Sequence, residues 1–308
     1  MGLFSSLLGG KKSSEERQKK DERRKFDVLK YDGVRARGMG QLPYAIRCFE
    51  QALALQADAE TMHYLAGAYL QVGELDKARA TLEQLTAAEP EQAGGWLSLG
   101  HVCFLQEDYA RMRAAAEQAL RTDGGSAAAH YLAGMAAYRL HDSLQAIVQL
   151  TQAMAADDRH VAARLLRAEV LWSMGQAREA LEDLVPLCAP EAVNEDALLL
   201  KGEILTATKD GDEGMACFDE VMELNPFSEK AYRLKGASLL ARKRTKEACD
   251  LFDEAVELMP DNARMYEERG RARLLSGDKD GAVADMKKAI ELDPACGQRI
   301  NGHFNNQG

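Results

Sequence analysis

The chain has 308 residues, of which 46% are apolar and 29% charged, and a net charge of −10. Residues 1–25 carry eight Lys/Arg against four Asp/Glu, a net charge of +4, so the rest of the chain stands near −14. Because binding to phosphates needs a continuous basic surface, this acidic balance argues against a nucleic-acid partner. Aromatic residues make up only 6%, and no run of alternating β-branched residues is long enough to predict a strand, so we expect an all-α protein.

Residues 1–25 are predicted to be an N-terminal apolar and basic tail with a linker. Leu3, Phe4, Leu7 and Leu8 would share one helical face, and the charged run KKSSEERQKKDERRK follows them. A secretory signal has the opposite order, and no stretch approaches the roughly 18 apolar residues that span a bilayer. Two interpretations stay open. One is weak contact with an anionic membrane surface through this segment, and the other is a disordered tail leading a solubilising linker.

From residue 26 to residue 296 the sequence repeats with a period of 34 residues. When Ala263 is counted as position 1, small residues recur in register at positions 8, 20 and 27. Position 8 reads Gly33, Ala66, Gly100, Gly134, Ala168, Gly202, Gly236 and Gly270. A glycine inside a helix costs about 1 kcal/mol relative to alanine, so its return at one phase indicates that another backbone passes too close for a side chain. Large residues fill position 24, so each repeat is predicted to be two helices that cross at small residues.

These landmarks resemble those of the tetratricopeptide repeat (TPR) family. The resemblance implies an all-α, right-handed α-solenoid superhelix of about eight helix-turn-helix units. The expected units are 26–58, 59–92, 93–126, 127–160, 161–194, 195–228, 229–262 and 263–296, each with a first helix near positions 1–14 and a second near 17–30. Position 7, usually Leu in the family, departs from the pattern in four later units, where it is Arg167, Lys201, Lys235 and Arg269.

Two places in the chain are expected to be irregular. Pro186 falls inside the second helix of the fifth repeat and Pro190 follows it, and each removes a backbone donor. We therefore expect residues 185–215 to be the least regular part of the array and a candidate flexion point. Residues 297–308 form a short polar tail, in which only Ile300 and Phe304 could cover the apolar strip of the last repeat.

In the TPR family, positions 2, 5, 9, 12 and 13 of the first helices line a groove that binds peptides. Carried over to this sequence, these positions give an apolar and aromatic set suited to gripping the side chains of a partner protein or peptide. We call this set the groove residues: His63, Leu70, Leu97, His101, Phe104, Tyr131, Met135, Tyr138, Leu165 and Trp172. The alternative is that position 12 packs against the neighbouring repeat.

Toward the C-terminus the same positions become basic, with Lys230, Arg233, Arg264 and Arg271. Arginine binds carboxylates in a two-pronged fashion, so an acidic segment or a chain terminus could dock there. The alternative is an ordinary solvated face that Glu267 and Glu268 partly neutralise.

No nucleophile elbow, phosphate-binding loop, H-E-x-x-H pair or dinucleotide fingerprint is present. The six cysteines form no C-x-x-C pair, which indicates reduced thiols in a cytoplasmic protein, and no cofactor or metal is expected. The sequence thus predicts a non-catalytic interaction module or adaptor. The alternative is a structural scaffold or self-assembling spacer, compatible with a homo-oligomer and with weak membrane-surface contact through residues 1–25.

Overall fold

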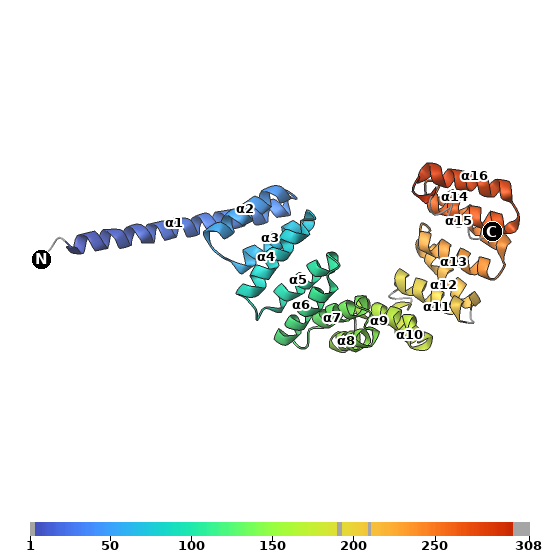
Figure 1. The fold of residues 1–308 in the computed structure, drawn as a ribbon, viewed down its shortest axis with the longest axis horizontal. Coiled ribbons are helices and arrows are strands. Elements are labelled where there is room, and N and C mark those ends of the chain that lie inside the picture. Colours follow the sequence, from blue (N-terminus) through green and yellow to red (C-terminus); the bar gives the residue numbers. More distant parts are fainter. Residues whose placement is uncertain (1–3, 190–192, 209–210, 298–308) are drawn as a thin grey trace. The chain divides into compact units, whose positions relative to one another are not determined.

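The computed structural model describes residues 4–189, 193–208 and 211–297, with side chains from residue 16 onward. Within these ranges the protein is all-helical, with sixteen α-helices, one short 3-10 helix and no strand (Figure 1). The chain divides into two compact parts, an N-terminal half ending at Ala163 and a C-terminal half beginning at Arg164.

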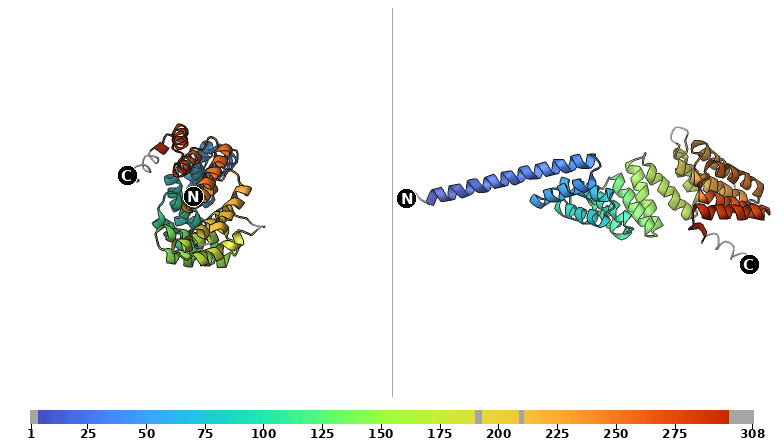
Figure 2. Two further views of the ribbon diagram at one scale, coloured as in Figure 1. Left: turned by 90° about the vertical axis from the view of Figure 1, so that its right-hand side faces the viewer. Right: turned by 90° about the horizontal axis from the view of Figure 1, so that it is seen from above.

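Antiparallel helix pairs build each half, and within a half the second helix of a pair packs on the first helix of the next, as α2 does on α3 and α12 on α13 (Figures 1 and 2). The N-terminal half contains α1 (Phe4–Gly38), α2 (Leu42–Leu55), α3 (Ala59–Gln71), α4 (Leu75–Ala88), α5 (Ala93–Leu105), α6 (Tyr109–Thr122), α7 (Ala127–Arg139) and α8 (Ser143–Ala156). After α9 (Val161–Ser173), which spans the division, come α10 (Ala177–Leu184), the 3-10 helix η1 (Val185–Leu187), α11 (Glu195–Ala207), α12 (Gly211–Leu224), α13 (Glu229–Ala241), α14 (Thr245–Leu258), α15 (Ala263–Ser276) and α16 (Lys279–Leu292).

The two helices of a repeat cross where the sequence places glycine. A Cβ added to Gly134 would stand 2.7 Å from Leu150 Cγ, and one added to Gly33 would stand 2.5 Å from the ring of Phe49. Real Cβ atoms do not approach other heavy atoms so closely, which confirms the prediction that position 8 is small for steric reasons. The residue in the way is the large side chain at position 24 of the same repeat.

The turn between the two helices of a repeat has a left-handed residue at position 15. Glycine fills this position in four repeats, at Gly40, Gly73, Gly175 and Gly277, with φ between 74° and 95°. In three others an ordinary residue adopts the same conformation: Glu107, His141 and Lys243, with φ between 58° and 62°. Since L-residues with a side chain are disfavoured there, these three turns are strained.

The first helix starts well before the repeat array. Residues 4–25, which the sequence analysis assigns to a tail and linker, continue α1 without a break from Phe4. Lys, Arg, Glu and Gln are all good helix formers, and Gln18 donates a hydrogen bond of 3.1 Å to Glu22 one turn away. Leu3 and the side chains of Phe4, Leu7 and Leu8 lie outside the described residues, so the predicted apolar face stays a prediction.

Pro186 ends the second helix of the fifth repeat early. α10 stops at Leu184 after eight residues and is followed by the three-residue η1, which contains the proline. In the other repeats the second helix has fourteen residues, as in α8 and α12. The predicted irregularity is confirmed here, whereas flexion in this segment stays a prediction and Pro190 lies outside the described residues.

The end of the array is partly covered by the chain that follows α16. Cys296 is fully buried and packs with Ala289, Tyr266 and Met286. Ile300 and Phe304 lie outside the described residues. Over the described part of the chain, none of the helices combines the length and apolarity of a membrane span.

Candidate functional site

Eight of the ten groove residues lie in the N-terminal half, on its first helices α3, α5 and α7. Among them, Phe104 at the end of α5 has the most defined surroundings. Its ring centroid lies 6.5 Å from that of Tyr109, and the guanidinium carbon of Arg139 lies 5.8 Å from its centroid. Phe104 is half-buried, so part of its side chain is open to solvent while it packs against the core.

The aliphatic members of the set serve the core as well as the surface. Leu70, Leu97 and Met135 are half-buried and, like Phe104, pack against the hydrophobic core of the N-terminal half. This supports the alternative that position 12 partly packs against its neighbours. The residues therefore form the floor of the surface and do not project from it.

Among the remaining members, only the two histidines are more accessible. His63 and His101 are exposed, whereas Tyr131 and Tyr138 are half-buried. The ring of Tyr131 lies 5.0 Å from that of His160. No cluster of three or more potential metal ligands occurs among the described residues.

The other two groove residues, Leu165 and Trp172, belong to the C-terminal half. Both lie on α9 and are half-buried. Eight of the groove residues thus lie on three first helices of one half and two on α9 of the other, and a binding groove along them stays a prediction.

The predicted basic end carries its own carboxylates. Glu268 lies 2.8 Å from Arg264 and 4.0 Å from each of Arg233 and Arg271, and its side chain is only 12% exposed. Arg264 also donates to Glu267 at 3.1 Å. These contacts follow the alternative interpretation, in which glutamates neutralise the face, and an acidic ligand would have to compete with Glu268.

Two further details distinguish this end of the chain. Lys230 is exposed and makes no ion pair among the described residues. The Nε of Arg264 is buried and has no hydrogen-bond partner. Lys230 is therefore the most available cation of the four.

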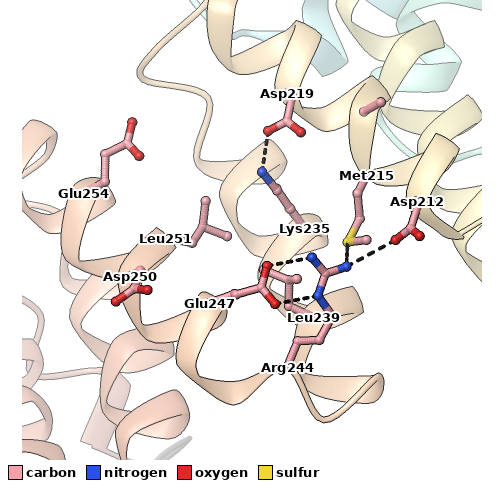
Figure 3. A pocket seen from close by; sticks show the side chains of 11 residues that line it. Asp212, Met215, Asp219, Lys235, Leu239, Arg244, Glu247, Asp250, Leu251 and Glu254 are labelled. Carbon is pink, nitrogen blue, oxygen red and sulfur yellow. Dashed lines mark hydrogen bonds and ion pairs between the residues drawn. The ribbon is translucent and has the colours of Figure 1, made fainter.

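A groove that the sequence analysis did not single out lies between α12, α13 and α14, with a volume of about 560 Å³ (Figure 3). Its apolar part comes from Met215, Leu239 and Leu251, and all three are buried. Five carboxylates surround this floor: Asp212, Asp219, Glu247, Asp250 and Glu254. We refer to it as the acidic groove.

The two cations of the acidic groove are already held. Arg244 donates two hydrogen bonds to Glu247, at 2.7 and 2.6 Å, and a third to Asp212 at 3.2 Å, and Lys235 is paired with Asp219 (Figure 3). The hydrogen bonds to Glu247 raise the pKa of Arg244, although partial burial opposes this, and the same bonds lower the pKa of Glu247. The groove keeps an excess of three negative charges. In the sequence, the feature that could have predicted it is the row of acidic residues on the second helices of two consecutive repeats.

The cysteines behave as small core residues. All six are free, and burial raises the pKa of Cys188 to about 11. Burial likewise raises the pKa of Cys103, Cys217 and Cys249. Because the thiolate is the reactive form, these shifts oppose nucleophilic or redox chemistry at neutral pH.

Two family models match the chain, and both describe a tetratricopeptide repeat. They cover residues 36–99 in the N-terminal half and residues 234–295 in the C-terminal half. The chain belongs to the TPR family. No curated protein sequence matches it.

Solved structures of TPR proteins share this fold at low sequence identity. The C-terminal part of a TPR protein from Cytophaga hutchinsonii is 17% identical with a TM-score of 0.61, covering 78% of this chain and 98% of that one. A TPR protein from Parabacteroides merdae is 16% identical with a TM-score of 0.60, covering 76% and 93%. PilW, a type IV pilus biogenesis factor, is 19% identical with a TM-score of 0.59, covering 68% and 97%. At these identities the likeness establishes the fold alone.

The TPR register explains the basic residues at position 7. Arg167 donates to both carboxylate oxygens of Asp183, at 2.7 and 2.5 Å, and Arg269 binds Asp285 in the same way. Asp183 and Asp285 stand at position 23 of these two repeats, and the other six repeats have neither arginine at 7 nor aspartate at 23. The hydrogen bonds that Arg167 donates to Asp183 raise the pKa of Arg167.

Position 7 also reaches across to the preceding TPR unit. Lys235 pairs with Asp219, and Arg269 and Arg273 both donate to Asp253, at 3.0 and 2.8 Å. Both aspartates stand at position 25 of the repeat before. Leucine at position 7 is thus replaced by ion pairs that tie neighbouring repeats together in the C-terminal half.

Proposed function

We propose that this TPR chain is a non-catalytic adaptor of the cytoplasm that binds a segment of a partner protein. TPR repeats imply a protein interaction module, and no specific partner follows from the fold. The observation that supports binding by α3, α5 and α7 is the half-buried aromatic and aliphatic surface around Phe104, with exposed histidines beside it. The side chains of this surface are already ordered in the free protein. Most of the conformational entropy lost on binding is therefore that of the bound segment.

The test is capture of partners by the full chain carrying Phe104→Ala and Trp172→Ala. If the groove residues hold the partner, the proteins captured by the wild type should be depleted at least about tenfold. Because both residues also pack inward, a second variant, His63→Glu with His101→Glu, changes only exposed side chains of the same surface and should give the same loss.

The matched control places two new charges on second helices. Gln84 on α4 and Gln152 on α8 are exposed, and their substitution by Glu should leave capture unchanged. If every captured protein stays bound to both groove variants, the proposed surface is wrong.

A second candidate function, that of a self-assembling scaffold, has its own supporting observation. The first helix of the array leaves Val28 and Tyr31 exposed at 52% and 71%, and these are among the most exposed large apolar residues in the described chain. Residues 4–25 belong to this same helix, so contact of that segment with a membrane surface would compete with self-assembly. The inference below develops the scaffold and is independent of the groove residues.

A further inference from the structure

α1 presents an exposed stripe that no other helix of the N-terminal half covers. Its members are spaced by three or four residues and therefore lie on one face of the helix. We call it the α1 stripe, and it consists of Arg17, Lys20, Arg24, Val28, Tyr31 and Arg35, all of them exposed. Figure 2 shows the N-terminal part of α1 running on beyond α2.

The same positions form the stacking surface in later repeats. Gly95, at position 3 of its repeat, faces Thr86 and Leu85 of the repeat before, and Leu132, at position 6, faces Gly100 of the repeat before. In the first repeat positions 3 and 6 are Val28 and Tyr31, and no repeat precedes them. Val28 and Tyr31 therefore form an apolar pair at positions that pack against a neighbouring element in later repeats.

The charge of the stripe is unbalanced. Its four cations make no ion pair among the described residues, whereas Lys30, on another face of the same helix, is held by Asp58 at 2.9 Å and Glu60 at 2.6 Å. Asp21 and Asp27, both exposed, flank the stripe at a spacing of three or four residues from its members, so four cations face two carboxylates and the excess is two positive charges. Its partner should therefore combine carboxylates with a small apolar area.

The acidic groove has this combination. It has an apolar floor and three uncompensated negative charges, and Asp250 makes no ion pair among the described residues. Within the described residues, Glu254 accepts a single long hydrogen bond of 3.3 Å, from Tyr232. In Figure 3 both carboxylates stand apart from the Arg244 and Lys235 pairs.

We propose that the α1 stripe of one molecule docks on the acidic groove of a second copy of this chain. The stripe and the groove are different surfaces, so each contact is heterologous. Such contacts either close into a ring, of which a reciprocal pair is the smallest, or continue as an open row. Each copy carries a net charge of −10, which opposes association and makes it weak. Association is therefore measured over a range of protein concentrations.

The test is light scattering of the full chain after size exclusion, together with two charge-reversed variants. The wild-type mass should rise above 33.8 kDa with concentration. Lys20→Glu with Arg24→Glu should raise the dissociation constant at least about tenfold, and Asp250→Lys with Glu254→Lys should do the same. An equimolar mixture of the two variants should associate again, because each reversed surface then meets its reversed complement.

The matched control is Lys19→Glu with Arg23→Glu, which changes the net charge of α1 equally but lies off the stripe. It should associate as the wild type does, and circular dichroism checks that every variant is folded. A wild type that stays at 33.8 kDa at all concentrations, or a mixture that stays monomeric, overturns the proposal. Flotation with phosphatidylglycerol vesicles is run in parallel. If the wild type stays monomeric but binds the vesicles, and Lys20→Glu with Arg24→Glu abolishes this binding, the stripe contacts a lipid surface instead.

Discussion

The ring of Phe252 lies against the backbone of Gly236 on the neighbouring helix, so that a Cβ added to Gly236 would stand 2.6 Å from Cε2 of the ring. This contact between positions 8 and 24 recurs along the array. It brings the two helices of each repeat closer than any larger side chain at position 8 would allow.

Gly236→Ala should destabilise the protein by about 2 kcal/mol, because overpacking outweighs the gain of about 1 kcal/mol in helix propensity. Urea denaturation measures the change. Gly94→Ala is the control, since Gly94 is helical and a Cβ there would meet nothing within 4 Å, so this variant should be more stable than the wild type. Phe252→Leu added to Gly236→Ala should recover part of the loss, and no recovery would show that the ring is not the obstacle.

The fold could be predicted from the sequence because the same packing requirements recur in every repeat, so each position is seen several times. The period places the first helices, which begin at residues 59, 93, 127, 161, 195, 229 and 263. A large residue at position 24 requires a small one at position 8, because the two pack against each other. Gly134 and Leu150 show this contact. The break at Pro186 follows from the missing backbone donor and from the clash of the proline ring with the preceding turn.

The parts that could not be predicted depend on charge. Residues 16–25 have no apolar period, so hydrophobic patterning gives no signal for the helix that they form. For the basic end the sequence left an open basic surface and a neutralised face as alternatives, and only the structure shows that three of the four cations lie near Glu268, which is nearly buried. Pairing between Arg at 7 and Asp at 23 was visible in the sequence, and would have explained Arg167 and Arg269.

Lys243→Gly should stabilise the protein by about 0.5 to 1 kcal/mol. Lys243 has a φ of 60° at position 15, and glycine adopts that conformation without the cost of a Cβ. Thermal unfolding followed by circular dichroism should show a higher midpoint. The reciprocal change, Gly277→Ala at the same position of the next repeat, where φ is 95°, should lower it. Equal midpoints for the wild type and Lys243→Gly would mean that the turn carries no strain.

Asp58→Asn should weaken the start of α3 in a pH-dependent way. Asp58 accepts hydrogen bonds from the backbone and hydroxyl of Thr61, at 2.9 and 2.6 Å, and from Lys30 at 2.9 Å. Partial burial raises the pKa of Asp58, but the bonds from Thr61 and Lys30 outweigh it and hold the pKa below its ordinary value. A lowered pKa in the folded state means that the stabilisation is complete above the unfolded pKa of about 3.9 and is lost as the pH falls through the folded value.

Asparagine keeps the cap acceptor and removes the charge, so Asp58→Asn should cost about 1 kcal/mol at neutral pH. The difference from the wild type should vanish toward pH ~2, where the Asp58 carboxyl is protonated. Urea denaturation of both proteins across this range measures it. A difference that is the same at every pH would assign the effect to packing and not to the charge.

Arg167→Leu should destabilise the protein by about 3 kcal/mol, because Asp183 is 5% exposed and would lose the guanidinium that binds both of its oxygens. The double variant Arg167→Leu with Asp183→Ala should recover most of this loss. It reproduces the pair that the third repeat already carries, Leu99 at position 7 and Ala115 at position 23, both buried there. Urea denaturation of the wild type, both single variants and the double variant gives the coupling between the two side chains, which should be at least about 2 kcal/mol. If the losses in unfolding free energy of the two single variants add up in the double variant, the two side chains act separately. An apolar pair and an ionic pair would then not be equivalent at these positions.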